Sequence, residues 1–233
     1  FGQGEASRVG ALVRQFGGSK VLLMAGGGSV KKNGAYDAVA VSLKEAGLPW
    51  CELWGVQANP RSGKVYEGIE LARTEGADFL LAIGGGSVID TAKAIAHGRA
   101  NPDIDIWDFW LGKKKVEKST PVGVILTIPA SGSETSDSAV LTDETILQKR
   151  GLNTDYNRPV FAIMDPTLAA TLPRRQVACG VTDILMHTLE RYFNPIQGNE
   201  TTMQLAESVL RVAIANGPAV VDNPGDYDAM SEI

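Results

Sequence analysis

The segment Asp78–Lys93 decides the fold, and it reads DFLLAIGGGSVIDTAK. Its apolar first part, Asp78–Ile83, has the length and composition of a buried strand, and the residues after the glycines predict a helix at about Val88–Ala96. Glycines at the end of a strand let a ligand approach the backbone closely, and the free N–H groups in the first turn of a helix attract phosphate. Gly84–Ser87 is therefore a candidate phosphate-binding turn, in which Ser87 would cap the helix and bond a phosphate oxygen.

This glycine run alone does not establish a nucleotide site. A turn that uses glycine only for its geometry has the same pattern, and the run is neither a Gly-x-Gly-x-x-Gly fingerprint nor a Walker loop. Support comes from a second run, Gly26-Gly27-Gly28-Ser29, which follows the strand predicted at Lys20–Ala25. In NAD-binding folds a carboxylate near a strand end commonly holds the ribose 2′-hydroxyl, and it would repel a 2′-phosphate. Glycines with Lys31 and Lys32 nearby favour NADP over NAD, although a solvated helix start is the alternative role for at least one lysine.

The rest of the chain continues to alternate apolar strands with amphipathic helices. Further strands are predicted at Trp50–Val56, Val122–Ile128 and Val160–Met164, with a polar hairpin at Ala139–Asn157 and a loop at Asn101–Trp110. Continuous apolar strands separated by helices indicate a mostly parallel sheet that is covered on both faces. We therefore expect an α/β, doubly wound, Rossmann-like domain over residues 1–173.

The pattern changes after Pro173. From Arg174 to Ala215 the sequence is helical, with an interruption at Asn194-Pro195 and no convincing further strand. We interpret residues 174–233 as the start of a second, all-helical domain.

Asp183 and His187 lie four residues apart in this helical part, so their side chains project from one face. A carboxylate and an imidazole one turn apart can ligate a divalent cation, and this pair of donors suits iron(II) or zinc. A surface hydrogen bond between the two is the more common reason for such a spacing. His97 is the only other histidine, and we interpret it as a residue at the C-terminal end of its helix rather than as a ligand.

Hydroxyl groups gather in Thr127–Glu134, where the Val122–Ile128 strand ends. Hydroxyls at the carboxyl end of a strand suit ligand binding in a doubly wound sheet, and capping a following helix or turn is their alternative role. The segment is not the Gly-x-Ser-x-Gly elbow of hydrolases, and no obvious Ser-His-Asp set accompanies it. A hydrolase is therefore disfavoured.

The charge balance and the cysteines exclude further classes. The 233 residues include 22 basic and 27 acidic side chains, which give a formal net charge of −5 and do not recommend nucleic acid or an anionic membrane as a partner. The longest apolar runs are too short to span a membrane, and the chain opens without a signal segment. Cys51 and Cys179 lie far apart and fit two reduced thiols, so we expect a cytoplasmic protein.

Four segments carry a family resemblance, and in chain order they are Gly84–Lys93, Pro129–Glu134, Asp165-Pro166 and Gly180–Thr188. Together they resemble the iron-containing alcohol dehydrogenase family, with the closest likeness to its NADPH-dependent butanol dehydrogenase and aldehyde reductase branch. The resemblance implies a dehydroquinate synthase-like nucleotide domain, an all-helical metal-binding domain and an active site in the cleft between them. It also implies hydride transfer between NADPH and a small alcohol or aldehyde, and it makes metal binding at Asp183 and His187 the favoured interpretation.

The resemblance also assigns roles to single residues. The residues of the 84–87 turn would hold the pyrophosphate, Thr127 and Ser131 would line the nucleotide, Lys149 would approach the ribose, and Asn59 would lie near the adenosine. Gly27 stands where NAD-preferring relatives carry an aspartate, which agrees with the preference for NADP. The expected cofactor site comprises Gly26, Gly27, Gly28, Ser29, Asn59, Gly84, Gly85, Gly86, Ser87, Asp90, Thr127, Ser131 and Lys149.

One departure from the family affects the expected activity. Family members continue into helices that supply two more histidine ligands, whereas this sequence has no histidine after His187 and ends at Ile233. We therefore expect a fragment with weak metal binding and little turnover by itself, whose exposed domain interface favours a homo-oligomer. The alternative is a nucleotide-binding module without catalysis. A lyase of the dehydroquinate synthase type would need a basic substrate pocket that the sequence does not identify.

Overall fold

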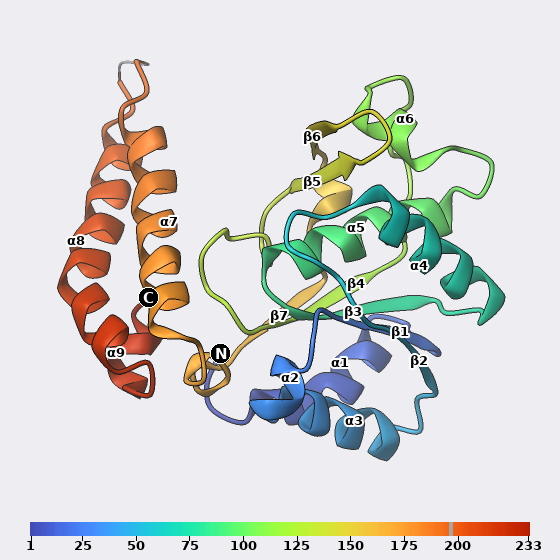
Figure 1. Cartoon of the computed structure of the whole chain (residues 1–233), viewed down its shortest axis with the longest axis horizontal. Helices are drawn as coiled ribbons and strands as arrows, with labels where there is room; N and C mark the ends of the chain where they lie inside the picture. The colour runs from blue at the N-terminus through green and yellow to red at the C-terminus, as the bar shows by residue number, and fades with distance from the viewer. Residues whose placement is uncertain (196–197) are drawn as a thin grey trace.

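The structure is a computed structural model that describes residues 1–195 and 198–233. Its strands are β1 (Val21–Ala25), β2 (Trp50–Leu53), β3 (Phe79–Gly84), β4 (Val122–Leu126), β5 (Ser138–Asp143), β6 (Gln148–Asn153) and β7 (Phe161–Met164). A parallel sheet with the order β2-β1-β3-β4-β7 forms the centre of the fold, and β5 pairs with β6 as a separate antiparallel hairpin (Figure 1). The α/β fold and the hairpin that the sequence predicts are both confirmed.

Helices cover both faces of the sheet. The helices of the described residues are α1 (Val9–Gln15), α2 (Ser29–Lys32), α3 (Ala35–Glu45), α4 (Ser62–Thr74), α5 (Gly86–Ala100), α6 (Ile106–Trp110), α7 (Arg174–Tyr192), α8 (Glu200–Asp222) and α9 (Tyr227–Ser231), with 3-10 turns at Glu5–Arg8, Asp155–Asn157 and Pro166–Ala169. In Figure 1, α1 and α3 lie on one face of the sheet and α4 and α5 on the other.

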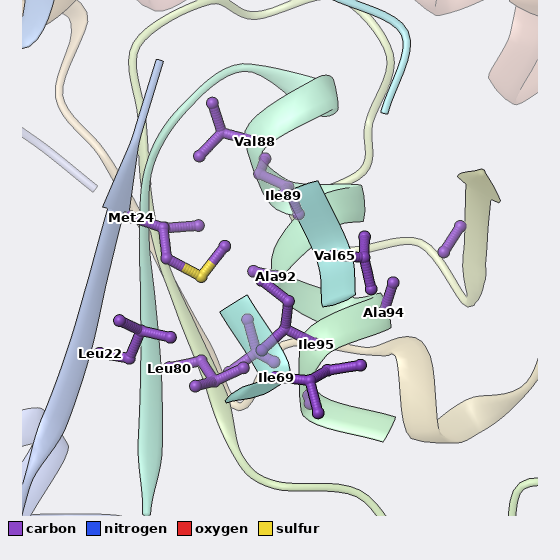
Figure 2. Packing of buried hydrophobic residues seen from close by; sticks show 14 of the residues in the cluster. Leu22, Met24, Val65, Ile69, Leu80, Val88, Ile89, Ala92, Ala94 and Ile95 are labelled. Atoms are coloured by element: carbon purple, nitrogen blue, oxygen red, sulfur yellow. The ribbon is translucent and has the colours of Figure 1, made fainter. Parts of the chain in front are cut away.

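Side chains of β1 alternate between these two layers. Leu22 and Met24 pack with the residues of α4 and α5, whereas Val21 and Leu23 pack with those of α1 and α3. Figure 2 shows Leu22 and Met24 directed toward α5 in the first of these two cores. Because both faces of the sheet are covered, its strands are apolar at nearly every position.

The chain reverses its direction of travel across the sheet between β1 and β3. After β1 it moves outward to β2, and it then returns to β3 on the other side of β1 before continuing to β4 and β7. In doubly wound sheets, ligands bind outside the carboxyl ends of the strands at such a switch point. Ala25 and Ile83 are partners in the parallel pairing of β1 and β3, so the two glycine runs begin side by side.

The prediction of a loop throughout residues 101–110 is wrong, because α6 forms there. The Asp105 side chain caps this helix by accepting a hydrogen bond from the backbone N–H of Trp107 at 2.8 Å. Trp107, Phe109 and Trp110 are buried in the core on the α5 side of the sheet. The error has two causes. Aspartate is common in loops as well as at helix N-caps, and α6 is only about one turn long.

The helical part follows the sheet, as predicted. α7 and α8 run side by side as a hairpin (Figure 1), and Val177, Val181 and Val220 belong to a buried cluster of their own. The predicted interruption at Asn194-Pro195 falls between these helices, and α8 continues past Ala215 to Asp222. Among the helices of the described ranges, none has both the length and the apolar character needed to cross a membrane.

Candidate functional site

Two glycine turns lie at the switch point of the sheet. The first (residues 26–29) connects β1 to α2, and the second (residues 84–87) connects β3 to α5. Gly85 occupies the N-cap position of α5, so Ser87 lies inside the helix and does not cap it as predicted. The Ser87 hydroxyl instead accepts a hydrogen bond from the backbone N–H of Asn59 at 3.2 Å.

The two turns use glycine for different reasons. A Cβ on Gly86 would lie 2.5 Å from the Ser131 hydroxyl oxygen, and one on Gly85 would lie 3.1 Å from the Cβ of Ile128. The second turn therefore needs glycine for its own packing. A Cβ on Gly27 or Gly28 would meet no described atom within 4 Å, so these two glycines leave open space. A Cβ at either position would point into space that the protein itself does not fill.

A cleft extends from the first turn to the start of α7. Its volume is about 380 Å³, and the residues that line it include Ser29, Lys32, Thr127, Ile128 and Gln176. Positive and hydroxyl-bearing side chains thus border an opening beside the first turn. Thr127 is buried, and its backbone N–H donates to the Gly84 carbonyl oxygen at 3.1 Å, which joins the end of β4 to the second turn.

Three of the predicted cofactor residues meet although they lie on different elements. The Lys149 ammonium on β6 donates a hydrogen bond to the Asn59 side-chain oxygen at 3.0 Å, and Asn59 contacts Ser87 as described above. Asn59 has a φ of 58°, a left-handed conformation that asparagine tolerates better than most residues. The loop after β2, the β5–β6 hairpin and the start of α5 therefore converge beside the second turn.

Glu52 is the acidic residue of β2, the strand that pairs with β1, and its carboxylate is bonded to aromatic donors. Its carboxylate accepts hydrogen bonds from the Tyr36 hydroxyl at 2.6 Å and from the indole N–H groups of Trp50 at 3.0 Å and Trp54 at 2.6 Å. Burial acts to raise the pKa of the Glu52 carboxyl, but these hydrogen bonds outweigh burial and lower the pKa below its ordinary value. Glu52 is therefore ionised and already bonded within the protein.

Lys31 and Lys32 differ in their surroundings. The Lys31 ammonium lies 4.4 Å from the centre of the Trp54 ring and 5.0 Å from that of Tyr36, which is the geometry of a cation–π contact. Lys32 is exposed and lines the 380 Å³ cleft. Lys31 is therefore held by aromatic rings, whereas the exposed Lys32 fits the alternative of a solvated lysine.

Asp90 and His97 both lie inside α5, and their side chains bond to the protein. The Asp90 carboxylate accepts hydrogen bonds from the Ser133 hydroxyl and the Val140 backbone N–H. The two ring nitrogens of His97 lie 2.9 Å from the Ser119 hydroxyl and 2.8 Å from the Asn157 amide oxygen. α5 continues to Ala100, so His97 lies in the last turn of its helix, as predicted, and its side chain is buried there.

Asp183 and His187 form a close pair on α7. The distance between Asp183 Oδ1 and His187 Nε2 is 3.6 Å, and the two side chains are 48% and 43% exposed. Asp183 lines a cleft of about 590 Å³, and His187 lines another of about 410 Å³. One oxygen and one nitrogen donor fit the chemistry of iron(II) or zinc. Within residues 1–195 and 198–233 no group of three or more His, Cys, Asp or Glu is placed to hold a metal, so the pair is at most part of a ligand set.

The cleft that contains His187 also contains cations that the sequence analysis did not identify. Arg158 and Arg191 line it together with Ser131 and Asp137. Arg158 donates to the Thr135 carbonyl oxygen at 2.9 Å, and Arg191 donates to the His187 carbonyl oxygen at 3.3 Å. These arginines belong to segments that are far apart in sequence, so no local pattern brings them together.

Comparison with known proteins identifies a matching family and several relatives. The profile of the family described as iron-containing alcohol dehydrogenase matches residues 1–166. The chain is 40% identical over 233 residues to NADH-dependent butanol dehydrogenase A of Clostridium acetobutylicum, with 100% of this chain and 59% of the relative covered. It is 38% identical over 217 residues to NADPH-dependent aldehyde reductase YqhD of Escherichia coli, with 92% of this chain and 56% of the relative covered.

A solved structure of a butanol dehydrogenase also matches the chain. The crystal structure of NADH-dependent butanol dehydrogenase A from Thermotoga maritima matches with a TM-score of 0.95 at 39% identity, covering 100% of this chain and 58% of that one. The chain thus spans about 59% of the length of the butanol dehydrogenase from Clostridium. The matched residues 1–166 contain both glycine turns, the hairpin and the whole parallel sheet. The resemblance noted from the sequence is confirmed, and the chain belongs to the iron-containing alcohol dehydrogenase family.

Proposed function

We propose that this protein is an NADP-dependent, metal-containing alcohol dehydrogenase or aldehyde reductase, which transfers hydride between NADP and a small alcohol or aldehyde. The pair of glycine turns at the switch point of the sheet carries the proposal. The start of α5 offers free backbone N–H groups to a pyrophosphate, and the open space at Gly27 and Gly28 leaves room for the rest of a nucleotide. Membership of the family supports the same chemistry.

In this proposal, different residues around the two turns contact different parts of the nucleotide. Gly84, Gly85, Gly86 and Ser87 hold the pyrophosphate, and Thr127 and Ser131 line its path from the end of β4. Lys149 and Asn59 lie at the ribose and adenosine end, where their hydrogen bond joins the hairpin to the loop after β2. Gly26, Gly27, Gly28 and Ser29 leave space for the 2′-phosphate.

Three features support NADP rather than NAD. Gly27 supplies no carboxylate that would repel a 2′-phosphate, and the carboxylate of Glu52 is bonded to aromatic side chains. Lys31 and Lys32 provide positive charge next to the first turn. The names of the relatives divide on this point, since the butanol dehydrogenase from Clostridium is described as NADH-dependent and YqhD as NADPH-dependent.

Asp183 and His187 would hold a divalent ion, iron or zinc, which when bound supplies a Lewis acid for the substrate oxygen. The nicotinamide supplies or accepts the hydride, and the residues of this chain bind and orient the dinucleotide. Residues 174–233 would then begin the helical metal-binding domain after a nucleotide domain of residues 1–173. A site with two protein ligands should bind its metal weakly.

Calorimetry with NADP and NAD tests the cofactor proposal on this chain. We expect NADP to bind more tightly by about tenfold or more, and a preference for NAD would contradict the interpretation of Gly27. Assays with butanal and NADPH test the activity. We expect little or no turnover from this chain alone, and robust metal-dependent oxidation of NADPH would contradict that expectation.

A nucleotide-binding module without catalysis is the second candidate. The observation that favours it is the lack of a third metal donor beside Asp183 and His187 in the part of the chain that the structure describes. It predicts NADP binding without any metal bound through this pair, so metal titration of the wild-type chain and of Asp183→Asn separates the two candidates. A cytoplasmic location and a homo-oligomer remain predictions.

A further inference from the structure

Polar side chains line one face of α5, where Lys93 and His97 are closed to solvent and the Asp90 side chain is 14% exposed. Asp90, Lys93 and His97 follow each other at helical spacing, and Lys93 and His97 have 0% exposure. A charged side chain without access to water must find its partners within the protein. The partners of Asp90 and Lys93 come from the stretch between β4 and β7, which includes the β5–β6 hairpin, whereas His97 bonds to Asn157 of that stretch and to Ser119 just before β4.

The Lys93 ammonium and the Asp90 carboxylate, both on α5, bind the same segment of the chain, residues 133–140. Lys93 donates to the Ser133 hydroxyl at 3.0 Å and to the carbonyl oxygens of Ser136 at 3.1 Å and Ser138 at 2.8 Å, which uses all of the donors of an ammonium. Asp90 accepts from the Ser133 hydroxyl at 2.5 Å and from the Val140 N–H at 2.9 Å. Ser133 therefore joins the two charged groups, whose charged atoms lie 4.0 Å apart.

Further charges surround this pair. Burial lowers the pKa of the Lys93 ammonium to about 8, against the opposing effect of Asp90, Glu134 and Asp137, while Arg158 lowers it further. Burial also raises the pKa of the Asp90 carboxyl, against its hydrogen bonds and the positive charges of Lys93 and Lys149. Two buried charges that depend on each other make the position of the bonded segment specific.

The same segment forms the wall of the second glycine turn. A Cβ on Gly86 would lie 2.5 Å from the Ser131 hydroxyl oxygen, so Ser131 lies directly against this turn, and the Cβ of Ser133 lies at the edge of the same contact. Ser131 and Ser136 also line the cleft that contains His187. Displacement of residues 131–138 would therefore change both the turn and the cleft.

We propose that Asp90 and Lys93 are positioning residues that hold residues 131–138 against the second glycine turn, so that nucleotide binding depends on them although neither contacts the nucleotide. This inference rests on the proposed function, because it takes NADP to bind at this turn. For Asp90 it replaces the direct contact with the cofactor that the sequence predicts.

Hydrogen exchange and calorimetry on the whole chain test the inference. Ser133→Ala removes the hydroxyl that joins the two charges, and Lys93→Met removes the ammonium but keeps an unbranched side chain. In both variants the amides of residues 132–138 should exchange faster while those of β1 and β3 stay protected, and NADP affinity should fall by about tenfold. Ser42→Ala is the matched control, because Ser42 is also a buried serine, bonded to Ser7 and Gly10 on the other face of the sheet.

Each outcome decides the inference. Unchanged exchange of residues 132–138 in folded Ser133→Ala overturns it, and so does an NADP affinity equal to that of wild type. An equal effect of Ser42→Ala on the segment and on affinity also overturns it. If the wild-type chain binds no NADP, the proposed function fails, and exchange alone then supports or overturns the positioning role. If Lys93→Met does not fold, Ser133→Ala decides the test by itself.

Discussion

Lys149 on the β5–β6 hairpin donates a hydrogen bond to Asn59 in the loop after β2, with 3.0 Å between Nζ and Oδ1, although the two residues lie 90 positions apart. Asn59 also contacts Ser87 in the first turn of α5. The hairpin is therefore tied to the start of the helix that we propose to bind the pyrophosphate. An ammonium in this place adds positive charge where an anionic ligand would bind.

Lys149→Met should weaken NADP binding by about tenfold, because it removes this ammonium and leaves Asn59 without its partner. Arg150→Met is the matched control, since neighbouring residues of a strand face opposite sides and the Arg150 guanidinium donates to Gln148. Titration calorimetry measures both affinities. Equal losses in the two variants would indicate a general effect of positive charge and contradict a specific role for Lys149.

Gly27→Asp should shift the preference from NADP toward NAD. A Cβ fits at this position without meeting a described atom within 4 Å, and Gly27 is not among the glycines with a positive φ. The new carboxylate would repel a 2′-phosphate and accept hydrogen bonds from a ribose, so the ratio of NADP to NAD affinity should fall by about tenfold or more. Gly27→Asn has the same size without the charge and should not reverse the preference. An unchanged ratio of NADP to NAD affinity in Gly27→Asp would contradict the proposal that the 2′-phosphate lies beside Gly27.

Gly86→Ala should destabilise the protein by about 1–3 kcal/mol, because the added Cβ overpacks the contact with Ser131. Gly28→Ala is the control, since Gly28 has a φ of −74° and an added Cβ meets no described atom within 4 Å. Its free energy of unfolding should stay within about 1 kcal/mol of wild type. Urea unfolding measures both. A similar loss in the two variants would contradict the different reasons given for the glycines in the two turns.

Sequence patterns predicted the parts of this fold that depend on local order. β1 and β3 are apolar throughout because both of their faces are covered, and each ends in a glycine run. Parallel pairing of Ala25 with Ile83 then brings the two turns together. The general position of the candidate nucleotide site therefore follows from the pattern of strands and helices.

The buried polar face of α5 could not be predicted in the same way. A helix that carries Asp90, Lys93 and His97 looks solvent-exposed in sequence, and the segment that covers it follows about 40 positions later. Burial of these side chains depends on the path of the β5–β6 hairpin, and that path cannot be predicted from a local sequence pattern. For the same reason the sequence does not indicate that Trp54 and Tyr36 hold Lys31.

The buried imidazole of His97 should make the protein less stable in mild acid. Burial lowers the pKa of His97 from 6.5 to about 4, against the hydrogen bond with Asn157. Between these values the unfolded chain binds a proton that the folded chain does not, so stability is fully present above pH 6.5 and decreases as the pH falls toward 4. The expected loss from this group between pH 7 and pH 5 is about 2 kcal/mol.

Urea unfolding at these two pH values checks this loss. His97→Gln should reduce the difference between them by about 2 kcal/mol, although the variant is less stable at pH 7 because it loses buried hydrogen bonds. His187→Gln is the control, because it removes the other histidine of the chain, which is 43% exposed, and keeps the buried imidazole of His97. A wild-type pH dependence in His97→Gln would assign the acid sensitivity to other groups.

Asp183 and His187 offer one oxygen and one nitrogen donor on adjacent turns of α7, so a divalent ion should bind between them with low affinity. Titration with Zn²⁺ should show this binding in the wild-type chain, and Asp183→Asn and His187→Gln should each weaken it by about tenfold or more. Glu200→Gln removes an acidic side chain at the start of α8 and serves as the control for charge. Because the pair lies on α7 and the glycine turns on the sheet, NADP affinity should be the same in all three variants. Zn²⁺ binding that persists in both Asp183→Asn and His187→Gln would place the ion elsewhere, whereas loss of NADP affinity with the metal would show that the two sites depend on each other.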